Sequence, residues 1–231
     1  MNFSAELVKG TILKCYKNLI LDVKIGNKVV AAFCPELDAQ QNLYSIGREV
    51  WLLPVNHPHR KLRYETQMIN HDGSLVMISP EYSEILLQEA FRQGNLEGFQ
   101  NYNRLRRVSV QDDLHYVHFE FSNEREEKCY VYAVNIYNKQ GGNVVFPSGL
   151  SFYQMAVFTE FEKLRKAGYE TKLLFLVPRD DCADIQFVWT VNPMAAARIF
   201  DEAKNGLKFC GYGCTITTKD ISINRKMKIV Y

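Results

Sequence analysis

The sequence lacks any run of about 18 consecutive apolar residues, so we expect no membrane-spanning helix. Its first ten residues contain no basic segment followed by an apolar stretch, and we therefore expect no signal peptide. Neither sign of charge is in excess, because 28 Lys and Arg face 26 Asp and Glu. The net charge of +2 taken alone argues against nucleic acid as a partner, but local clusters of charge matter more than the sum.

The sequence also lacks the cysteine spacing of a disulfide-rich or zinc-binding protein. Six cysteines are scattered through 231 residues, a length that can bury its own core without cross-links. Cys210 and Cys214 have no second Cys or His pair at the spacing that zinc sites use. We therefore expect free thiols and a cytoplasmic protein.

The first 80 residues predict a small all-β domain. Short runs rich in β-branched and aromatic residues alternate with hairpin-type turns at 25–28 and 70–73. Five or six short strands in a segment of this length favour a small barrel such as the oligonucleotide-binding (OB) fold. The predicted strands span residues 10–16, 19–25, 28–34, 49–55, 64–70 and 74–78.

The remaining residues predict an α/β domain. Ser79 and Pro80 precede a helical pattern that Gly94 can end, so we place the domain boundary between 1–80 and 81–231. The fold class is thus α+β with two domains. The further predicted helices are 151–166 and 193–205, and the predicted strands are 114–122, 129–137, 171–177, 185–191, 207–217 and 221–223.

The hairpin at 114–137, followed by a helix, has the frame of many Mg²⁺-dependent nucleases. Such enzymes carry Asp on the first strand and Glu-x-Lys on the second, whereas this chain has Glu120, then Tyr132 and Val134. Mg²⁺ requires several hard oxygen ligands, so Glu120 alone is a weak metal candidate. We expect no catalytic residue and no cofactor. Tyr132 and Val134 should pack a former cleft, and Glu120 should face solvent or pair with a base such as His118 or Lys128.

Six short motifs follow one another along the chain. They are CYKNL at 15–19, FCPELD at 33–38, RKLRYE at 60–65, FEF at 119–121, CYVYAVN at 129–135 and FPSGLS at 146–151. In order and spacing they resemble the bacterial sugar fermentation stimulation protein family over nearly the whole chain. The resemblance implies an OB-fold-like barrel joined to a PD-(D/E)xK nuclease-like domain, and a DNA-associated regulatory role in sugar metabolism. It places the family's catalytic Asp, Glu and Lys at Glu120, Tyr132 and Val134, which implies an inactive nuclease homologue.

Nucleic-acid binding can survive the loss of catalysis. Phosphate contacts need only cations and backbone donors, and bases can stack on aromatic rings. We therefore predict a DNA-binding protein, with RNA as the alternative ligand and the oligomeric state left open. The predicted binding residues are Lys14, Tyr16, Lys17, Arg60, Lys61, Arg63, Tyr64, Arg104, Arg106 and Arg107.

Two alternatives remain open from the sequence. The first is a divergent metal-dependent nuclease that uses Mg²⁺ at a relocated site containing Asp112, Asp113 or Glu160. The second is a protein-interaction module that has lost nucleic-acid binding, because Cys15 stands where the resembled family has Arg. The sequence leaves the strandedness and base preference of the ligand open, as well as any target genes.

Overall fold

The computed structural model divides the chain into two units. Neither contains a helix, among the described residues, long and apolar enough to cross a membrane. The described residues are 1–16, 19–35, 43–57, 59–79, 81–108, 114, 118–147 and 156–231. The first unit comprises Met1–Leu86, Pro178–Asp181 and Cys214–Ser222. The second comprises Leu87–Val177, Cys182–Gly213 and Ile223–Tyr231.

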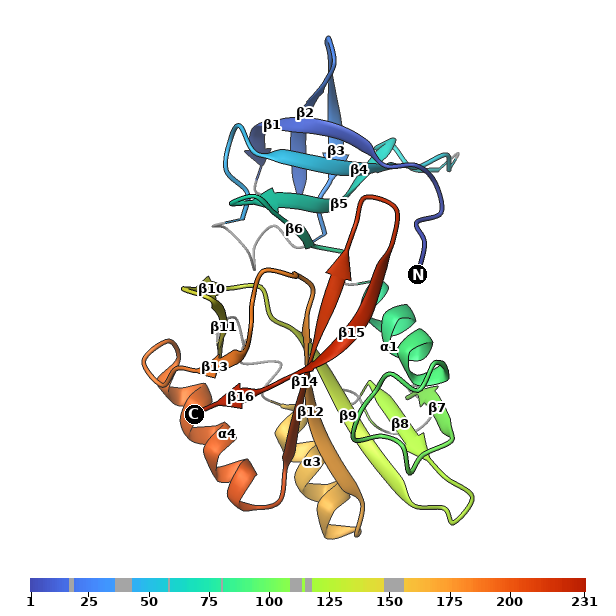
Figure 1. The fold of residues 1–231 in the computed structure, drawn as a ribbon, viewed down its shortest axis with the longest axis vertical. Coiled ribbons are helices and arrows are strands. Elements are labelled where there is room, and N and C mark those ends of the chain that lie inside the picture. Colours follow the sequence, from blue (N-terminus) through green and yellow to red (C-terminus); the bar gives the residue numbers. More distant parts are fainter. Residues whose placement is uncertain are drawn as a thin grey trace. The chain divides into compact units, whose positions relative to one another are not determined.

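A five-stranded barrel forms most of the first unit. Its strands are β1 (Val8–Tyr16), β2 (Ile20–Ile25), β3 (Lys28–Phe33), β4 (Glu49–Pro54) and β5 (Tyr64–His71), and β6 (Ser74–Met77) pairs with β5 outside the ring. Antiparallel pairs run β3-β2-β1-β4-β5, and a parallel pair between β3 and β5 closes the circle (Figure 1). The predicted OB-fold-like barrel is confirmed, with each predicted strand within two residues of its observed ends.

The barrel interior follows from alternation along the strands. Ile12, Leu21 and Val50 are fully buried, while neighbouring positions of the same strands face outward. Strands β1 and β2 approach each other so closely at Gly10 that a Cβ there would lie 2.4 Å from a Val23 methyl carbon. Only glycine fits this contact, so Gly10 sets the spacing of the two strands.

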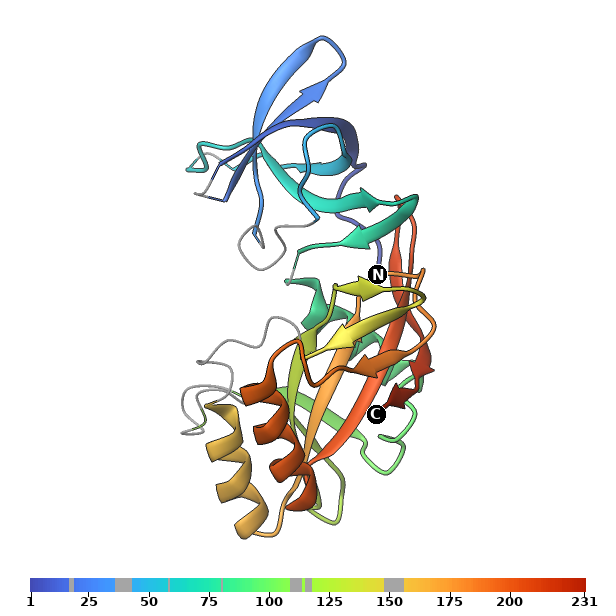
Figure 2. The ribbon, with the colours of Figure 1, turned by 90° about the vertical axis from the view of Figure 1, so that its left-hand side faces the viewer.

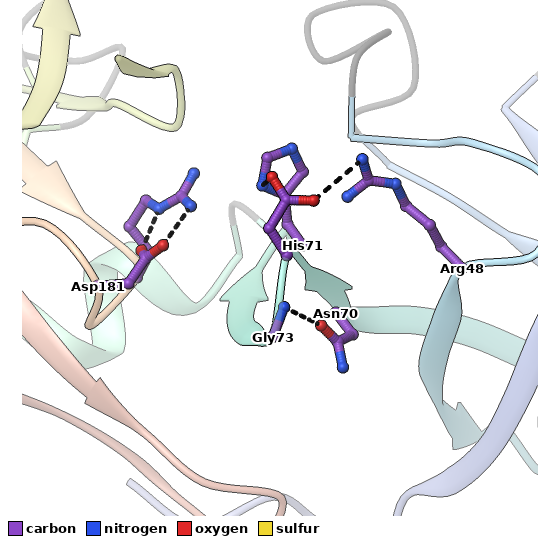
Figure 3. A network of polar contacts seen from close by, with 7 residues as sticks. Arg48, Asn70, His71, Gly73 and Asp181 are labelled. Atoms are coloured by element: carbon purple, nitrogen blue, oxygen red, sulfur yellow. Dashed lines mark hydrogen bonds and ion pairs between the residues drawn. The ribbon is translucent and has the colours of Figure 1, made fainter. Parts of the chain in front are cut away.

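A polar network joins a later segment of the chain to the barrel unit. The segment Pro178–Asp181 forms an isolated antiparallel bridge to β6 through Arg179. The fully buried Arg179 guanidinium donates two hydrogen bonds to Asp181, at 2.6 and 2.8 Å (Figure 3). His71 lies in the same network, and its burial together with the charge of Arg48 lowers the pKa of its imidazole.

Two sheets and the helices form the second unit, except that parts of α1, β14 and β15 are counted with the first unit. The larger sheet has the order β15-β14-β12-β9-β8-β7, in which β9, β12 and β14 are parallel and β8 is antiparallel to both neighbours. Its strands are β7 (Arg104–Arg107), β8 (Phe119–Ser122), β9 (Lys128–Asn135), β12 (Glu170–Val177), β14 (Lys208–Ile216) and β15 (Ile221–Met227). The smaller sheet has the order β10-β11-β13-β16 and consists of β10 (Lys139–Gln140), β11 (Asn143–Phe146), β13 (Ile185–Phe187) and β16 (Ile229–Val230).

The helices are α1 (Tyr82–Arg92), α3 (Val157–Lys166) and α4 (Pro193–Lys204). Figure 2 shows α3 and α4 side by side along one face of the larger sheet. Helix α4 begins where the Asn192 side chain accepts a hydrogen bond from the Ala195 amide, with Pro193 in its first turn. Phe158 and Phe161 of α3 are fully buried against this sheet face, which gives the unit its core.

Several elements differ from the sequence-based expectation. The predicted strand 185–191 ends at Phe187, because Trp189, Thr190 and Val191 form an exposed turn. The predicted helix start at 151 lies outside the described residues, as does Pro80. Strand β7 was not predicted, because its sequence RLRR lacks an apolar alternation; pairing with β8 holds it in the sheet.

Candidate nucleic-acid interface and nuclease-like strands

Strand register brings four strand ends of the barrel together. Tyr16 faces Ile20, Ile20 faces Phe33, and Phe33 faces Glu65, so this row runs across β1, β2, β3 and β5. The β1–β2 turn and the β4–β5 loop, residues 55–63, therefore leave the barrel at the same end. These are the two loops with which OB folds bind oligonucleotides.

The β1 end of this surface offers a cation and an aromatic ring. The Lys14 ammonium lies 4.6 Å from the centroid of the Tyr16 ring, within the range of a cation–π contact. The Tyr16 hydroxyl donates a 2.7 Å hydrogen bond to Asp22 on the facing strand, which holds the ring in place. Lys17, the third predicted residue of this turn, lies outside the described residues.

The β4–β5 loop carries most of the predicted cations. Arg60 forms a 2.6 Å ion pair with the buried Glu65 carboxylate and so fastens the loop to the start of β5. Lys61 is exposed, and Arg63 is exposed and donates to the His57 carbonyl oxygen at 3.4 Å. Tyr64 begins β5 directly after the loop. The structure thus brings together six of the seven predicted barrel residues at one end.

Glu120 lies at the centre of a group of charges on neighbouring strands. On β8 it faces Arg106 of β7 and Tyr130 of β9. Arg106 donates to both carboxylate oxygens, from Nε at 3.1 Å and from Nη2 at 2.7 Å, and Lys128 Nζ lies 3.6 Å away. The side chain of Glu120 is only 5% exposed. The expectation of a solvent-facing Glu120 is wrong, whereas pairing with Lys128 is confirmed and Arg106 is the closer partner.

The neighbouring cations and the Tyr130 hydroxyl keep the Glu120 carboxylate charged. Burial alone would raise its pKa, but hydrogen bonds from Arg106 and Tyr130 and the charges of Arg106 and Lys128 outweigh burial and lower it. A carboxylate that already serves two cations has little capacity left for a metal ion. It acts here as a structural counter-ion.

His118 does not serve as the base of Glu120. Its Nδ1 accepts a hydrogen bond from the Ala133 amide at 3.3 Å, and its ring lies 4.4 Å from the ring of Tyr132. His118 is exposed as a whole residue, but desolvation of its imidazole and the charge of Arg107 lower the pKa of the ring. His118 is therefore neutral near pH 7, and its pairing with Glu120 is excluded.

Tyr132 and Val134 belong to the core of the second unit. They are 6% and 9% exposed and lie in one cluster with Val157, Phe158 and Phe161 of α3. Because residues two apart on a strand share a face, Tyr130, Tyr132 and Val134 point to the side of the sheet that α3 and α4 cover. The positions at which the frame would need an acid and a lysine are thus filled by packing side chains.

Alternation along β7 divides the three predicted arginines. Arg104 and Arg106 share the face of Glu120, whereas Arg107 lies opposite Phe119 on the other face. Arg106 is paired with Glu120, so the three arginines do not form one continuous row of cations available to a ligand. Sequence reasoning missed the pair of Arg106 with Glu120, although opposite charges at matching positions of two adjacent strands are the pattern that could have revealed it.

No group of three or more His, Cys, Asp and Glu side chains within the described ranges could hold a metal ion. Asp112 and Asp113 lie outside those ranges. Glu160 lies in the first turn of α3 and is buried. Cys210 and Cys214 are buried and form no disulfide bond.

Comparisons with known proteins cover both units. The model of the family described as "Sugar fermentation stimulation protein RE domain" matches residues 81–220. The chain is 26% identical to the sugar fermentation stimulation protein homolog of Maricaulis maris, over 99% of this chain and 98% of that protein. It is also 26% identical to the homolog of Paramagnetospirillum magneticum, over 96% and 95% of the two chains. Its fold is similar to the solved structure of Pyrococcus furiosus SfsA in complex with Ca²⁺, with a TM-score of 0.85, 13% identity, and coverage of 100% and 98%.

Proposed function

The chain belongs to the sugar fermentation stimulation protein family, and from this premise we propose that it binds nucleic acid through its barrel without cleaving it. The observation that carries the proposal is the gathering of cations and aromatic rings where the β1–β2 turn and the β4–β5 loop leave the barrel. Phosphate groups bind exposed Lys and Arg, and bases stack on exposed rings. Since the family is named for the stimulation of sugar fermentation, the proposed role is regulatory.

The surface at this end of the barrel has the composition that the proposal needs. Lys14, Lys61 and Arg63 are exposed, and Tyr16 presents a ring held by its own hydrogen bond. Arg60 supports them, because its ion pair with Glu65 fixes the loop before any ligand arrives. A preorganised loop loses less conformational entropy on binding than a free one.

The absence of cleavage is proposed from the nuclease-like strands. Phosphodiester hydrolysis with Mg²⁺ requires converging carboxylates and a cation near the attacking water. Glu120 is held by Arg106 and Lys128, while Tyr132 and Val134 provide packing. We propose that this part of the sheet supports the fold and no longer performs catalysis.

The test is a titration of labelled single- and double-stranded DNA, followed by fluorescence anisotropy with EDTA or Mg²⁺ at several salt concentrations. The variant Lys61→Glu/Arg63→Glu reverses two exposed charges of the β4–β5 loop. Its matched control, Lys24→Glu/Lys28→Glu, reverses two exposed charges at the far end of the barrel. We expect the loop variant to bind at least about tenfold more weakly, with a shallower salt dependence, and the control to bind nearly as the wild type.

Each alternative function predicts a different result. Mg²⁺-dependent cleavage that EDTA stops would restore the nuclease with a relocated site and overturn the inactive-site proposal. Absence of binding to DNA and RNA would favour the protein-interaction module. Equal weakening by the loop variant and its control would show that the barrel end is not the binding surface.

A further inference from the structure

A row of aromatic rings lies on the surface of the second unit. The ring centroids of Tyr231 and Phe187 are 5.9 Å apart, those of Phe187 and Trp189 5.5 Å, and those of Trp189 and Phe200 5.4 Å. The row thus connects the end of the chain, β13 and α4. We call these four residues the aromatic row.

The aromatic row is exposed although its members are large and apolar. Phe187 is buried and anchors it, whereas Trp189 and Phe200 are each 46% exposed and Tyr231 is 78% exposed. Val191 and Met194, which lie between Trp189 and Phe200 in the sequence, are exposed as well. With Trp189, Phe200 and Tyr231 they make up five of the eleven exposed large hydrophobic side chains among the described residues. A cluster of this kind marks a binding surface rather than scattered surface residues.

The rings are held in place before any ligand binds. The pairs formed by Phe187 with Trp189, and by Trp189 with Phe200, meet edge to face at 72° and 65°. This is a favoured packing geometry that fixes the orientation of the rings. Fixed rings that are part-exposed are suited to stacking against another flat group.

A cation lies at one end of the aromatic row. The Lys204 ammonium is 4.4 Å from the centroid of the Phe200 ring, one helical turn away on α4. Lys204 also lines a charged groove between α3 and α4, whose other cations, Arg165, Lys166 and Arg198, are each ion-paired with a glutamate. No carboxylate of the described residues lies within ion-pair distance of Lys204, so its charge is available to a ligand.

These features favour one occupant. Part-exposed aromatic rings next to an available ammonium match the chemistry of single-stranded nucleic acid, which offers a flat base and an adjacent phosphate. In a duplex the bases are already stacked on one another and cannot reach such rings.

We propose that Trp189 and Phe200 stack on the bases of a single-stranded nucleic-acid segment, with Lys204 contacting its phosphate. The inference rests on the proposed nucleic-acid binding and extends it, because it adds a second contact and names the single-stranded form as its ligand. The aromatic row would supply selection for unpaired bases.

The fluorescence of Trp189 offers a direct test, because the chain has two tryptophans and Trp51 is buried in the barrel unit. Emission is followed during titration with the oligonucleotides dT10 and U10 and with a ten-base-pair duplex, alongside the anisotropy of the same labelled strands. We expect saturable quenching by a single strand and none by the duplex. Phe200→Ala should weaken the single-strand affinity roughly 5- to 100-fold. The matched control is Tyr169→Ala, which removes an exposed ring of the same unit outside the aromatic row.

The possible results separate this inference from the proposed function. Quenching by dT10 or by U10 that Phe200→Ala weakens and Tyr169→Ala preserves supports the inference, and circular dichroism establishes that both variants are folded. A rise in anisotropy with unchanged Trp189 emission overturns the inference and leaves binding at the barrel standing. No rise in either signal overturns both. Unchanged emission together with a dimer that Trp189→Ala converts to a monomer also overturns the inference, because the row is then a contact between copies of the chain.

Discussion

Replacing Arg106 by alanine should destabilise the protein through Glu120. The change removes two hydrogen bonds from a carboxylate that is 5% exposed, at 3.1 and 2.7 Å. Loss of one partner from a fully buried ion pair costs about 3–5 kcal/mol. The Arg106 side chain is 46% exposed, so solvent screens the pair, and Lys128 and Tyr130 still face the carboxylate after the change. We therefore expect a loss of about 2 kcal/mol in the free energy of unfolding at pH 7.

The pH dependence identifies the cause of this loss. The pKa of Glu120 is lowered in the folded protein, so its ion pair stabilises the fold above the ordinary pKa of 4.5, and this contribution is lost as the pH falls through the folded value. Arg106 supplies the largest of the influences that lower the pKa of Glu120, so this pKa should rise in Arg106→Ala. The difference between wild type and Arg106→Ala should therefore be largest near pH 7 and shrink toward pH 3.

The measurement is urea unfolding followed by circular dichroism at pH 7, 5 and 3. Arg104→Ala is the matched control, because Arg104 is exposed on the same face of the same strand and lies opposite Ser122 instead of Glu120. The control should change stability by no more than about 0.5 kcal/mol. Equal effects of the two substitutions, or a loss for Arg106→Ala that does not change with pH, would refute the assignment of Glu120 as a buried counter-ion.

Two further predictions concern groups in the barrel unit. Burial and the charge of Arg48 lower the pKa of His71, so the unfolded chain binds a proton below the ordinary value of 6.5 while the folded protein does not. The free energy of unfolding should therefore fall as the pH decreases below 6.5, and His71→Gln should flatten this decrease; an unchanged slope in thermal unfolding between pH 7.5 and 5.5 would contradict it. Cys15 is partly exposed, whereas the other five thiols are buried, so a thiol reagent should label Cys15 first in the native protein and all six in urea. Mass spectrometry of the labelled peptides provides the check, and early labelling of another cysteine would count against the described packing.

The sequence predicted the barrel well because its signals are local. Alternating apolar residues and glycine-containing turns each specify a strand or a hairpin from a few neighbouring residues. The β3–β5 closure is different, since it joins residues about 30 positions apart and leaves no local pattern. It was expected only because five or six such strands commonly close into a barrel.

The candidate sites were less predictable because they depend on partners that are distant in sequence. Arg60 reads as one cation of a basic cluster, yet its position is set by the buried Glu65. Arg106 also appears in the sequence as one cation of a basic cluster. It neutralises Glu120 across the β7–β8 pair, and β7 lacks the apolar alternation that would have predicted a strand there. In both cases charge alone could not separate a residue that holds the structure from one that meets a ligand.

The same distinction bears on the proposed absence of catalysis at the strands around Glu120. A site that binds Mg²⁺ gathers like charges, which repel one another in the absence of the ion. In this chain Glu120 is surrounded by Arg106, Lys128 and Tyr130, while Tyr132 and Val134 join the apolar core beneath α3. Such an arrangement needs no metal ion for its stability. Restoring the acid and the lysine at positions 132 and 134 would place two charges among packed rings, at a cost of several kcal/mol each. We therefore expect that one or two substitutions at these positions would not create a stable metal site.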